Sequence, residues 1–401
     1  MPVRTDTAKH EESITVMKFA LFLPASWTDK DTVHQSRIYG EVLEQARYAE
    51  ELGFDSLWIA EHHSSRYGIF PSLMPILSHI AAQTKTIRLG AGVSVLPFHN
   101  PIRLAEETAM VDLLSNGRLN LGVGRGSADY EYGNFKIDFD SRDDRFREVL
   151  DIILGLWTTE DFTYHGRYYQ VDGITIAPRP LQKPHPPIWI PGSNSPETMY
   201  EVANREFCYF LSTRGKLAGA KRSAVRFSEI VEEVGKEFHP HKMGLLFSVY
   251  VAETDEIARK ECEEAVFYFT RYCLKGHQRN AGRRLTMAPG GLSPQSWQMY
   301  LENSVVGAKM LGDAENWNDI DEMGSIFVGS PDTVYEKLWE FVTEANIGNL
   351  LIQFHIGNLS YDLTQKSQRI FAEQVMPRLR ADSENLFGER FPITIADNVP
   401  A

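Results

Sequence analysis

Short apolar runs alternate with amphipathic segments along most of the chain. The runs that predict buried strands lie at residues 18–23, 56–60, 87–96, 119–124, 187–191, 207–211, 244–252 and 349–354. Helical stretches or loops follow these runs, and in the two clearest helices, 38–52 and 141–157, the apolar positions recur at helical spacing. Repeated strand and helix alternation favours an α/β fold of the closed (β/α)8 TIM barrel type over a doubly wound sheet.

Two segments break this alternation. Residues 162–187 contain several tyrosines, an Asp172-Gly173 turn and five prolines, so we expect a hairpin followed by an extended crossing of the barrel rim. Residues 277–325 are longer and looser, with glycines and prolines before a helical patch at 297–310. A loop of that length is usually functional or disordered. We interpret it as a lid inserted near the C-terminal end of the barrel, the alternative being an insertion without a function.

Composition limits the class of protein. The chain has 401 residues, 43% of them hydrophobic, enough for one barrel or two ordinary domains. Because no interdomain linker is evident, we expect a flexible leader at 1–16, one barrel domain at 17–380 and a C-terminal tail at 381–401. A formal net charge of -13 argues against a general nucleic-acid surface.

The sequence also bears on location. Apolar runs are all well short of the ~20 residues of a membrane span, and the start of the chain lacks an apolar signal core. Three scattered cysteines are too few for a disulfide framework or a clustered metal site. We therefore expect a cytoplasmic protein with no membrane or nucleic-acid partner and no bound metal.

Candidate chemistry begins at the end of the second predicted strand, where Glu61, His62 and His63 follow an apolar run. The carboxyl ends of barrel strands are where active sites lie, and imidazoles there suit acid and base work. One alternative is a core histidine beside a surface histidine. The other is a zinc pair, which is disfavoured because adjacent residues on an extended chain point to opposite faces. Glu61 either orients the histidines or is a charge at the barrel rim, and we prefer the rim interpretation.

A phosphate site is predicted farther along the chain. Arg125 stands just past the fourth strand among small residues, so its guanidinium can turn toward a dianion. After the strand at 187–191 come Gly192, Ser193, Asn194 and Ser195, then a proline; Ser195 suits a helix N-cap. Free N–H groups at such a helix start bind phosphate readily. The alternative is an ordinary helix entry.

Several motifs together resemble the bacterial luciferase-like flavin-dependent monooxygenases. They lie at 53–63, 89–97, 100–101, 117–119, 122–126, 166–169, 178–182, 186–189, 327–331 and 375–377, so the resemblance covers roughly residues 17–380. The family implies a (β/α)8 barrel that binds reduced FMN at the carboxyl ends of its strands. It also implies a homodimer or a related heterodimer.

The resemblance implies roles for single residues. His62 matches the catalytic histidine of the luciferase α subunit, and His63 matches its neighbour in the same motif. Arg125 corresponds to a phosphate-binding arginine. Arg142 is a second candidate for that role, with Arg145 as the alternative. The family has an acid where Gly192 stands, so this contact differs in the present chain.

The bond between Gly92 and Val93 matches a family position where a non-proline cis peptide presses on the flavin ring, although glycine there can equally serve close packing. The spacing of Gly122, Gly124 and Gly126 does not fit a dinucleotide fingerprint, which argues against a Rossmann domain.

The expected activity follows from the family. It is a monooxygenase that uses dioxygen and reduced FMN, supplied by a separate reductase, and acts through a flavin peroxide on an apolar carbonyl or natural-product-like substrate. Aromatic residues near the predicted rim indicate an apolar partner, although they can also be packing; they are Trp27, Tyr67, Phe70, Phe98, Tyr130 and Tyr132. The alternatives are a deazaflavin-dependent oxidoreductase of the same superfamily and a non-catalytic flavin-binding subunit. His62 argues against both.

Overall fold

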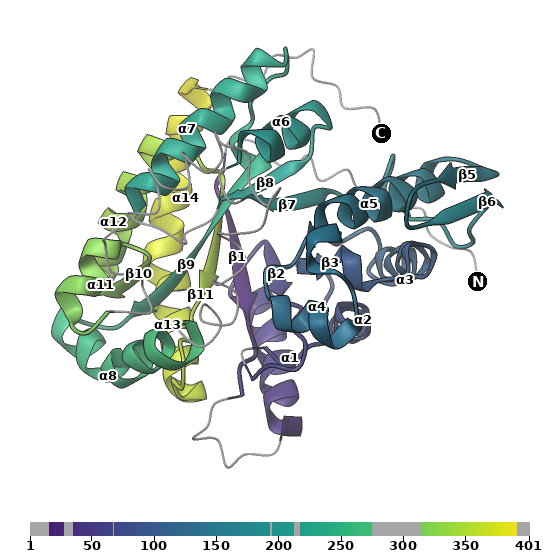
Figure 1. Ribbon diagram of the computed structural model, residues 1–401. Helices are drawn as coiled ribbons and strands as arrows, with labels where there is room; N and C mark the ends of the chain where they lie inside the picture. The colour runs from purple at the N-terminus through teal and green to yellow at the C-terminus, as the bar shows by residue number, and fades with distance from the viewer. Residues whose placement is uncertain are drawn as a thin grey trace, which may run out of the picture.

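A closed ring of parallel strands forms the centre of the molecule (Figure 1). The computed structural model describes residues 16–27, 35–66, 68–192, 195–211, 217–274 and 314–390. In ring order the strands are β1 (Lys18–Leu23), β2 (Ser56–Ile59), β3 (Arg88–Val95), β4 (Leu119–Gly124), β7 (Ile188–Gly192), β8 (Cys208–Leu211), β9 (Met243–Val251) and β11 (Asn349–Gln353). The ring closes because β11 pairs with both β9 and β1.

These are the strands that the apolar runs predict, and the (β/α)8 barrel is confirmed. One further strand, β10 (Ile326–Gly329), was not predicted. It pairs in parallel with the carboxyl-terminal half of β9, from Ser248 to Val251, and is not part of the ring. Its four residues are too few to show a pattern.

Helices surround the ring (Figure 1). Those longer than two turns are α1 (Gln35–Glu51), α2 (Leu73–Gln83), α3 (Pro101–Leu114), α5 (Arg142–Thr158), α6 (Pro196–Asn204), α7 (Leu217–Glu233), α8 (Asp255–Tyr268), α12 (Pro331–Ala345), α13 (Tyr361–Ile370) and α14 (Met376–Arg390). Shorter pieces are α4 (Asp129–Phe135), α11 (Trp317–Met323), η1 (Leu96–Phe98), η2 (Phe139–Ser141), η3 (Pro240–Lys242), η4 (Phe269–Leu274) and η6 (Phe371–Val375). Among the described helices, none has the length and apolar content needed to cross a bilayer.

Aromatic side chains fill the barrel interior. Trp58 on β2 contacts Phe210 on β8 at a ring distance of 4.8 Å, and Trp189 on β7 stacks on Phe210 at 4.5 Å. Because β2 is not a neighbour of β8 in the sheet, the contact between Trp58 and Phe210 crosses the interior, whereas Trp189 and Phe210 lie on adjacent strands. A Cβ at Gly90 would lie 2.1 Å from the Trp58 ring, so glycine there makes room for the indole. The result is an apolar floor beneath the strand ends.

Two segments, 162–187 and 277–325, break the alternation of strands and helices. The structure describes the first throughout and the second only from residue 314. β5 (Phe162–His165) and β6 (Gln170–Ile174) form the expected antiparallel hairpin, which projects away from the barrel (Figure 1). Of the predicted lid, 277–313 lie outside the described residues, as does most of the leader, 1–15. Residues 314–325 include α11, whose Ile320 and Met323 are buried.

The carboxyl end of the described chain belongs to a helix. Residues 381–390, which we assigned to a tail, continue α14, and their Ser383 and Phe387 are buried. Ser383 accepts a hydrogen bond from the backbone N–H of Met17, at the start of β1, over 3.0 Å. This contact ties α14 to the first strand.

Candidate functional site

His62 stands just beyond the carboxyl end of β2. Its backbone N–H donates to the Phe70 carbonyl over 3.2 Å, which folds the loop back over the strand end. Gly68 packs on the His62 ring: a Cβ there would lie 2.7 Å from Cδ2, and its φ of 114° lies in the region that favours glycine. The His62 side chain is 18% exposed, so it is held in place yet accessible.

Glu61 is the buried centre of a histidine cluster. Its side chain is 0% exposed. Oε1 lies 3.0 Å from Nε2 of His63, and Oε2 lies 3.0 Å from Nε2 of His99, the residue after η1. The preferred interpretation of Glu61 as a rim charge is therefore wrong, because the two imidazoles supply the partners that a buried carboxylate needs. Sequence reasoning missed His99, although it too follows the end of a predicted strand.

Burial and hydrogen bonding oppose each other in this cluster. Burial raises the pKa of Glu61, but the hydrogen bonds of His63 and His99 outweigh it and hold the pKa of that carboxyl below its usual range. Burial likewise lowers the pKa of His99, and the contact with Glu61 outweighs it, so the pKa of His99 is raised. The shifts favour a charged pair between Glu61 and His99.

We expect Glu61→Gln to destabilise the fold more at about pH 6 than at about pH 9. The raised pKa of His99 contributes stability below about 6.5, its ordinary value, and this is lost as the pH rises through the raised value. The lowered pKa of Glu61 contributes above about 4.3 and is lost as the pH falls through the lowered value. Urea unfolding at both pH values measures the difference.

A matched control for this variant is Glu148→Gln. Glu148 is also buried, but its carboxylate accepts backbone N–H groups of Arg167, Tyr168 and Tyr169, which carry no titrating proton in this range. Its cost should be the same at both pH values. An equal cost of Glu61→Gln at both pH values would contradict the charged pair.

Glu131 brings a second buried carboxylate to the same place. It lies on α4, which follows β4, and its side chain is 4% exposed. Oε1 accepts the backbone N–H of His63 over 2.9 Å and lies 3.7 Å from Nδ1 of His62. The ends of β2, β3 and β4 therefore converge on one cluster of two carboxylates and three histidines, His62, His63 and His99.

Arg125 links three elements at the same end of the barrel. It follows β4, and its Nη1 donates to Oδ1 of Asp143 on α5 over 2.7 Å. Its Nη2 donates to Oγ1 of Thr198 on α6 over 2.9 Å. The Tyr132 hydroxyl donates to the Arg125 carbonyl, which fixes the backbone. The guanidinium is 29% exposed and is thus positioned at the edge of the site.

The first turn of α6 lies beside this guanidinium. Ser195 is the N-cap, as the sequence predicts, and its Oγ accepts the N–H of Thr198 over 3.2 Å. Because Thr198 also accepts from Arg125, the arginine and the helix start meet. Ser193 and Asn194 lie outside the described residues.

Arg142 and Arg145 are the two further candidates for the phosphate contact, and Arg142 shares a partner with Arg125. Arg142 is buried at the start of α5, where its guanidinium covers the Phe139 ring at 4.3 Å and its Nη2 lies 3.8 Å from Asp143. Arg142 and Arg125 therefore share one carboxylate. Arg145 instead stacks on Tyr168 at 4.2 Å.

Gly92 lies on β3 and Gly122 on β4, the two strands that follow β2 in the ring. The Gly92–Val93 peptide is cis, which confirms the expected conformation; contact with a flavin ring stays a prediction. A Cβ at Gly92 would lie 3.4 Å from both Phe22 and Trp58. A Cβ at Gly122 would lie 2.1 Å from the Ala91 carbonyl oxygen. These near neighbours show that glycine serves close packing at both positions, while Gly92 and Val93 themselves stay half-buried.

Several of the aromatic residues expected at the rim are packing. Phe70 stacks edge-on with Tyr39, and Phe98 packs with Tyr132 at 4.7 Å. Tyr67 lies outside the described residues. Trp27 packs against the core with the Arg66 guanidinium 4.3 Å from its ring, and Tyr130 is half-buried. The structure therefore supports an apolar partner less strongly than the sequence does.

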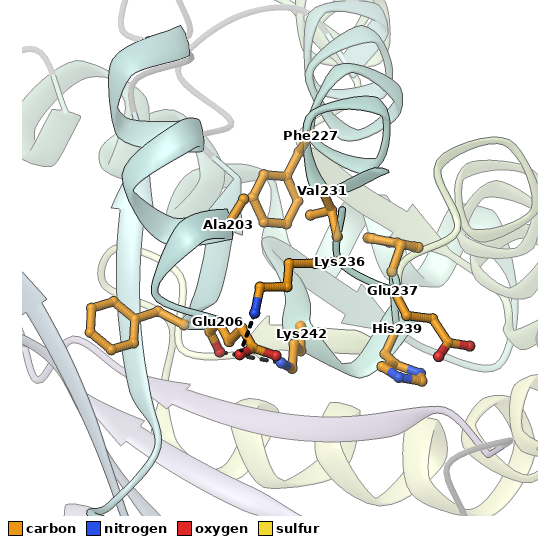
Figure 2. A pocket seen from close by; sticks show the side chains of 10 residues that line it. Ala203, Glu206, Phe227, Val231, Lys236, Glu237, His239 and Lys242 are labelled. Atoms are coloured by element: carbon orange, nitrogen blue, oxygen red, sulfur yellow. Dashed lines mark hydrogen bonds and ion pairs between the residues drawn. The ribbon is translucent and has the colours of Figure 1, made fainter. Parts of the chain in front are cut away.

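A hollow at the opposite end of the barrel is separate from this site. Figure 2 shows it between the carboxyl ends of α6 and α7, with Lys236 pointing to Glu206, and their ion pair spans 3.0 Å. Lys242 lines it just before β9 begins. Nowhere in the described part of the chain are three His, Cys, Asp or Glu residues grouped to hold a metal ion.

The chain belongs to the luciferase-like monooxygenase family, whose sequence model matches residues 17–346. It is 34% identical to the oxygenase component of the flavin-dependent trigonelline monooxygenase of Acinetobacter baylyi, over 63% of this chain and 70% of that protein. It is 27% identical to the F420-dependent glucose-6-phosphate dehydrogenase of Amycolatopsis mediterranei, over 85% of this chain and 95% of the relative.

A solved structure gives the same fold. The oxygenating constituent of 3,6-diketocamphane monooxygenase from Pseudomonas putida, a type II Baeyer-Villiger monooxygenase in complex with FMN, superposes with a TM-score of 0.73. The match covers 90% of this chain and 99% of that chain at 23% identity. The family model, which matches residues 17–346, confirms the family resemblance. Both flavin-dependent oxygenases and F420-dependent enzymes are among the relatives.

Proposed function

We propose that this protein is the oxygenase of a two-component flavin-dependent monooxygenase. A separate reductase supplies reduced FMN, and the oxygenase uses it with dioxygen to oxygenate an apolar carbonyl or natural-product-like substrate. The observation that supports this best is the joining of Arg125 to the first turn of α6 at the same barrel end as His62. Within this one end of the barrel, the Arg125 side suits an anion and the His62 side suits proton transfer.

The residues present fit FMN. Gly92 and Val93 are only half-buried near the carboxyl end of β3, so a flat ring system can approach the backbone there. Arg125, Arg142 and the start of α6 with Ser193, Asn194 and Ser195 would hold the phosphate, and Gly92 and Val93 would support the ring. When bound, the reduced flavin supplies two electrons that activate dioxygen, so that one oxygen atom enters the substrate and the other leaves as water.

The chain's own groups hold and move protons. His62 is accessible at the mouth, and an imidazole can accept and return a proton near neutral pH. His63 is bound to Glu61 and forms the support of the loop that presents His62. The aromatic floor of Trp58, Trp189 and Phe210 keeps water away from below.

The second candidate function is deazaflavin-dependent hydride transfer. The match to the F420-dependent dehydrogenase, over most of both chains, favours it. The two activities differ in their need for oxygen, because hydride transfer uses none. The homodimer and the cytoplasmic location stay predictions.

A cofactor exchange separates the two functions. Purified protein is incubated with a panel of aldehydes, ketones and aromatic compounds, either with reduced FMN in air or with a reduced deazaflavin under anaerobic conditions. We expect product only with reduced FMN and oxygen. Turnover confined to the anaerobic deazaflavin reaction would assign the chain to the second function.

A further inference from the structure

The His62 imidazole has a buried carboxylate on one side and a glycine on the other. Glu131 Oε1 lies 3.7 Å from Nδ1, within ion-pair range but longer than a hydrogen bond. Gly68 packs against Cδ2, the ring atom next to Nε2. Glu131 therefore lies at the Nδ1 edge of the ring and Gly68 at the edge that carries Cδ2 and Nε2. The surroundings of the two ring nitrogens differ for this reason.

Glu131 is itself fixed in place. The backbone N–H of His63 donates to its Oε1 over 2.9 Å. The neighbouring Tyr130 hydroxyl is hydrogen-bonded to it, and burial together with the charge of Glu131 raises the pKa of Tyr130 to about 12. The phenol therefore keeps its proton at neutral pH and can donate to the carboxylate. Glu131 is 3% exposed, so little water competes for it.

A carboxylate beside Nδ1 decides which tautomer the imidazole adopts. It favours the proton on Nδ1, since that N–H points toward the negative charge. Nε2 is then the nitrogen that can accept a proton. Gly68 has no side chain, so it lets the ring keep this orientation without a clash.

We propose that Glu131 is the positioning residue that sets the tautomer and orientation of His62, with Nδ1 protonated and Nε2 presented to the reacting group. This inference rests on the proposed role of His62 in proton transfer. The carboxylate comes from α4, in the loop region that also contains Arg125, so the same segment would organise both the proton-transfer and the phosphate side of the site.

The first test needs no cofactor or substrate. Imidazole ¹⁵N chemical shifts of His62, assigned with the His62→Ala variant, report the tautomer in the full-length protein. We expect the Nδ1–H form in the wild type and a shift toward the Nε2–H form or a mixture in Glu131→Gln. Glutamine keeps the volume and an acceptor for the His63 N–H, so the loop should stay folded. The same tautomer in both proteins would overturn the proposal.

The second test uses turnover. Glu131→Gln should lower kcat by about 10- to 100-fold, the usual range for a lost supporting partner, and leave the Kd for reduced FMN within about 3-fold. Glu148→Gln is the matched control, because it removes a buried carboxylate that binds the hairpin backbone; its kcat should be unchanged.

A double variant shows whether Glu131 acts through His62. His62→Ala combined with Glu131→Gln should be no slower than His62→Ala alone, because the supported group is already gone. Losses that multiply would mean that Glu131 acts independently, and would overturn the proposal. Failure of the proposed function is distinguishable, because a wild type without oxygenated product would still show the tautomer shift if Glu131 positions His62.

Discussion

His62→Ala should slow turnover by ~100-fold or more, the usual scale for a lost acid or base, while the affinity for reduced FMN changes by no more than a few-fold. The structure gives the reason for this separation. His62 is presented at the end of β2 beside Gly68 and Glu131, whereas the proposed phosphate contacts come from β4, α5 and α6. Removing the imidazole therefore removes a proton carrier and leaves the anchor intact. Steady-state turnover at saturating reduced FMN and anaerobic flavin titration measure the two effects.

The control for this variant is His165→Ala. His165 lies on the hairpin with its side chain 62% exposed and bonded to Asp172, so its loss should change neither quantity. Near-normal turnover of His62→Ala would show that His62 has no part in proton transfer.

Arg125→Ala should weaken reduced FMN by about one to two decades in Kd and riboflavin far less. Only FMN has the phosphate, and a charge-assisted hydrogen bond is worth roughly 1.5 to 3 kcal/mol. The guanidinium is held by Asp143 and Thr198, so it is already oriented toward the first turn of α6. Anaerobic titration with both flavins gives the comparison.

The change in riboflavin affinity measures any structural damage that the Arg125→Ala substitution causes. In Arg125→Ala, Asp143 loses its close partner and keeps the longer contact with Arg142, at 3.8 Å, so some local rearrangement should affect both flavins alike. Arg103→Ala is a surface control, because its side chain is 78% exposed and pairs with Glu107 on the same helix. Equal losses of FMN and riboflavin would show that Arg125 does not contact phosphate.

The sequence predicts the barrel well because its strands are buried on both faces. Such strands are continuous apolar runs separated by helices, and 119–124 is an example in which every residue of β4 is buried. The same pattern does not predict β10. Four residues pairing with only half of β9 carry too little pattern, and their role depends on a partner distant in sequence.

The site is predicted only in part, for a similar reason. Position at a strand end identifies His62 and Arg125, and local helix chemistry identifies Ser195 as an N-cap. Long-range pairing is what the sequence does not show. Nothing local indicates that Glu61 bonds His99, 38 residues away, or that Glu131 reaches His63, 68 residues away.

The most direct test of the central claim is the origin of the oxygen in the product. The protein is incubated with chemically reduced FMN, the panel of carbonyl and aromatic compounds, and ¹⁸O-labelled dioxygen in unlabelled water. The masses of the products are then measured by mass spectrometry. We expect a product with one ¹⁸O atom, whose formation depends on oxygen and reduced FMN and is diminished in His62→Ala. Product formed without oxygen, product lacking the label, or oxidation of the flavin with hydrogen peroxide as its sole product across the panel would contradict the central claim.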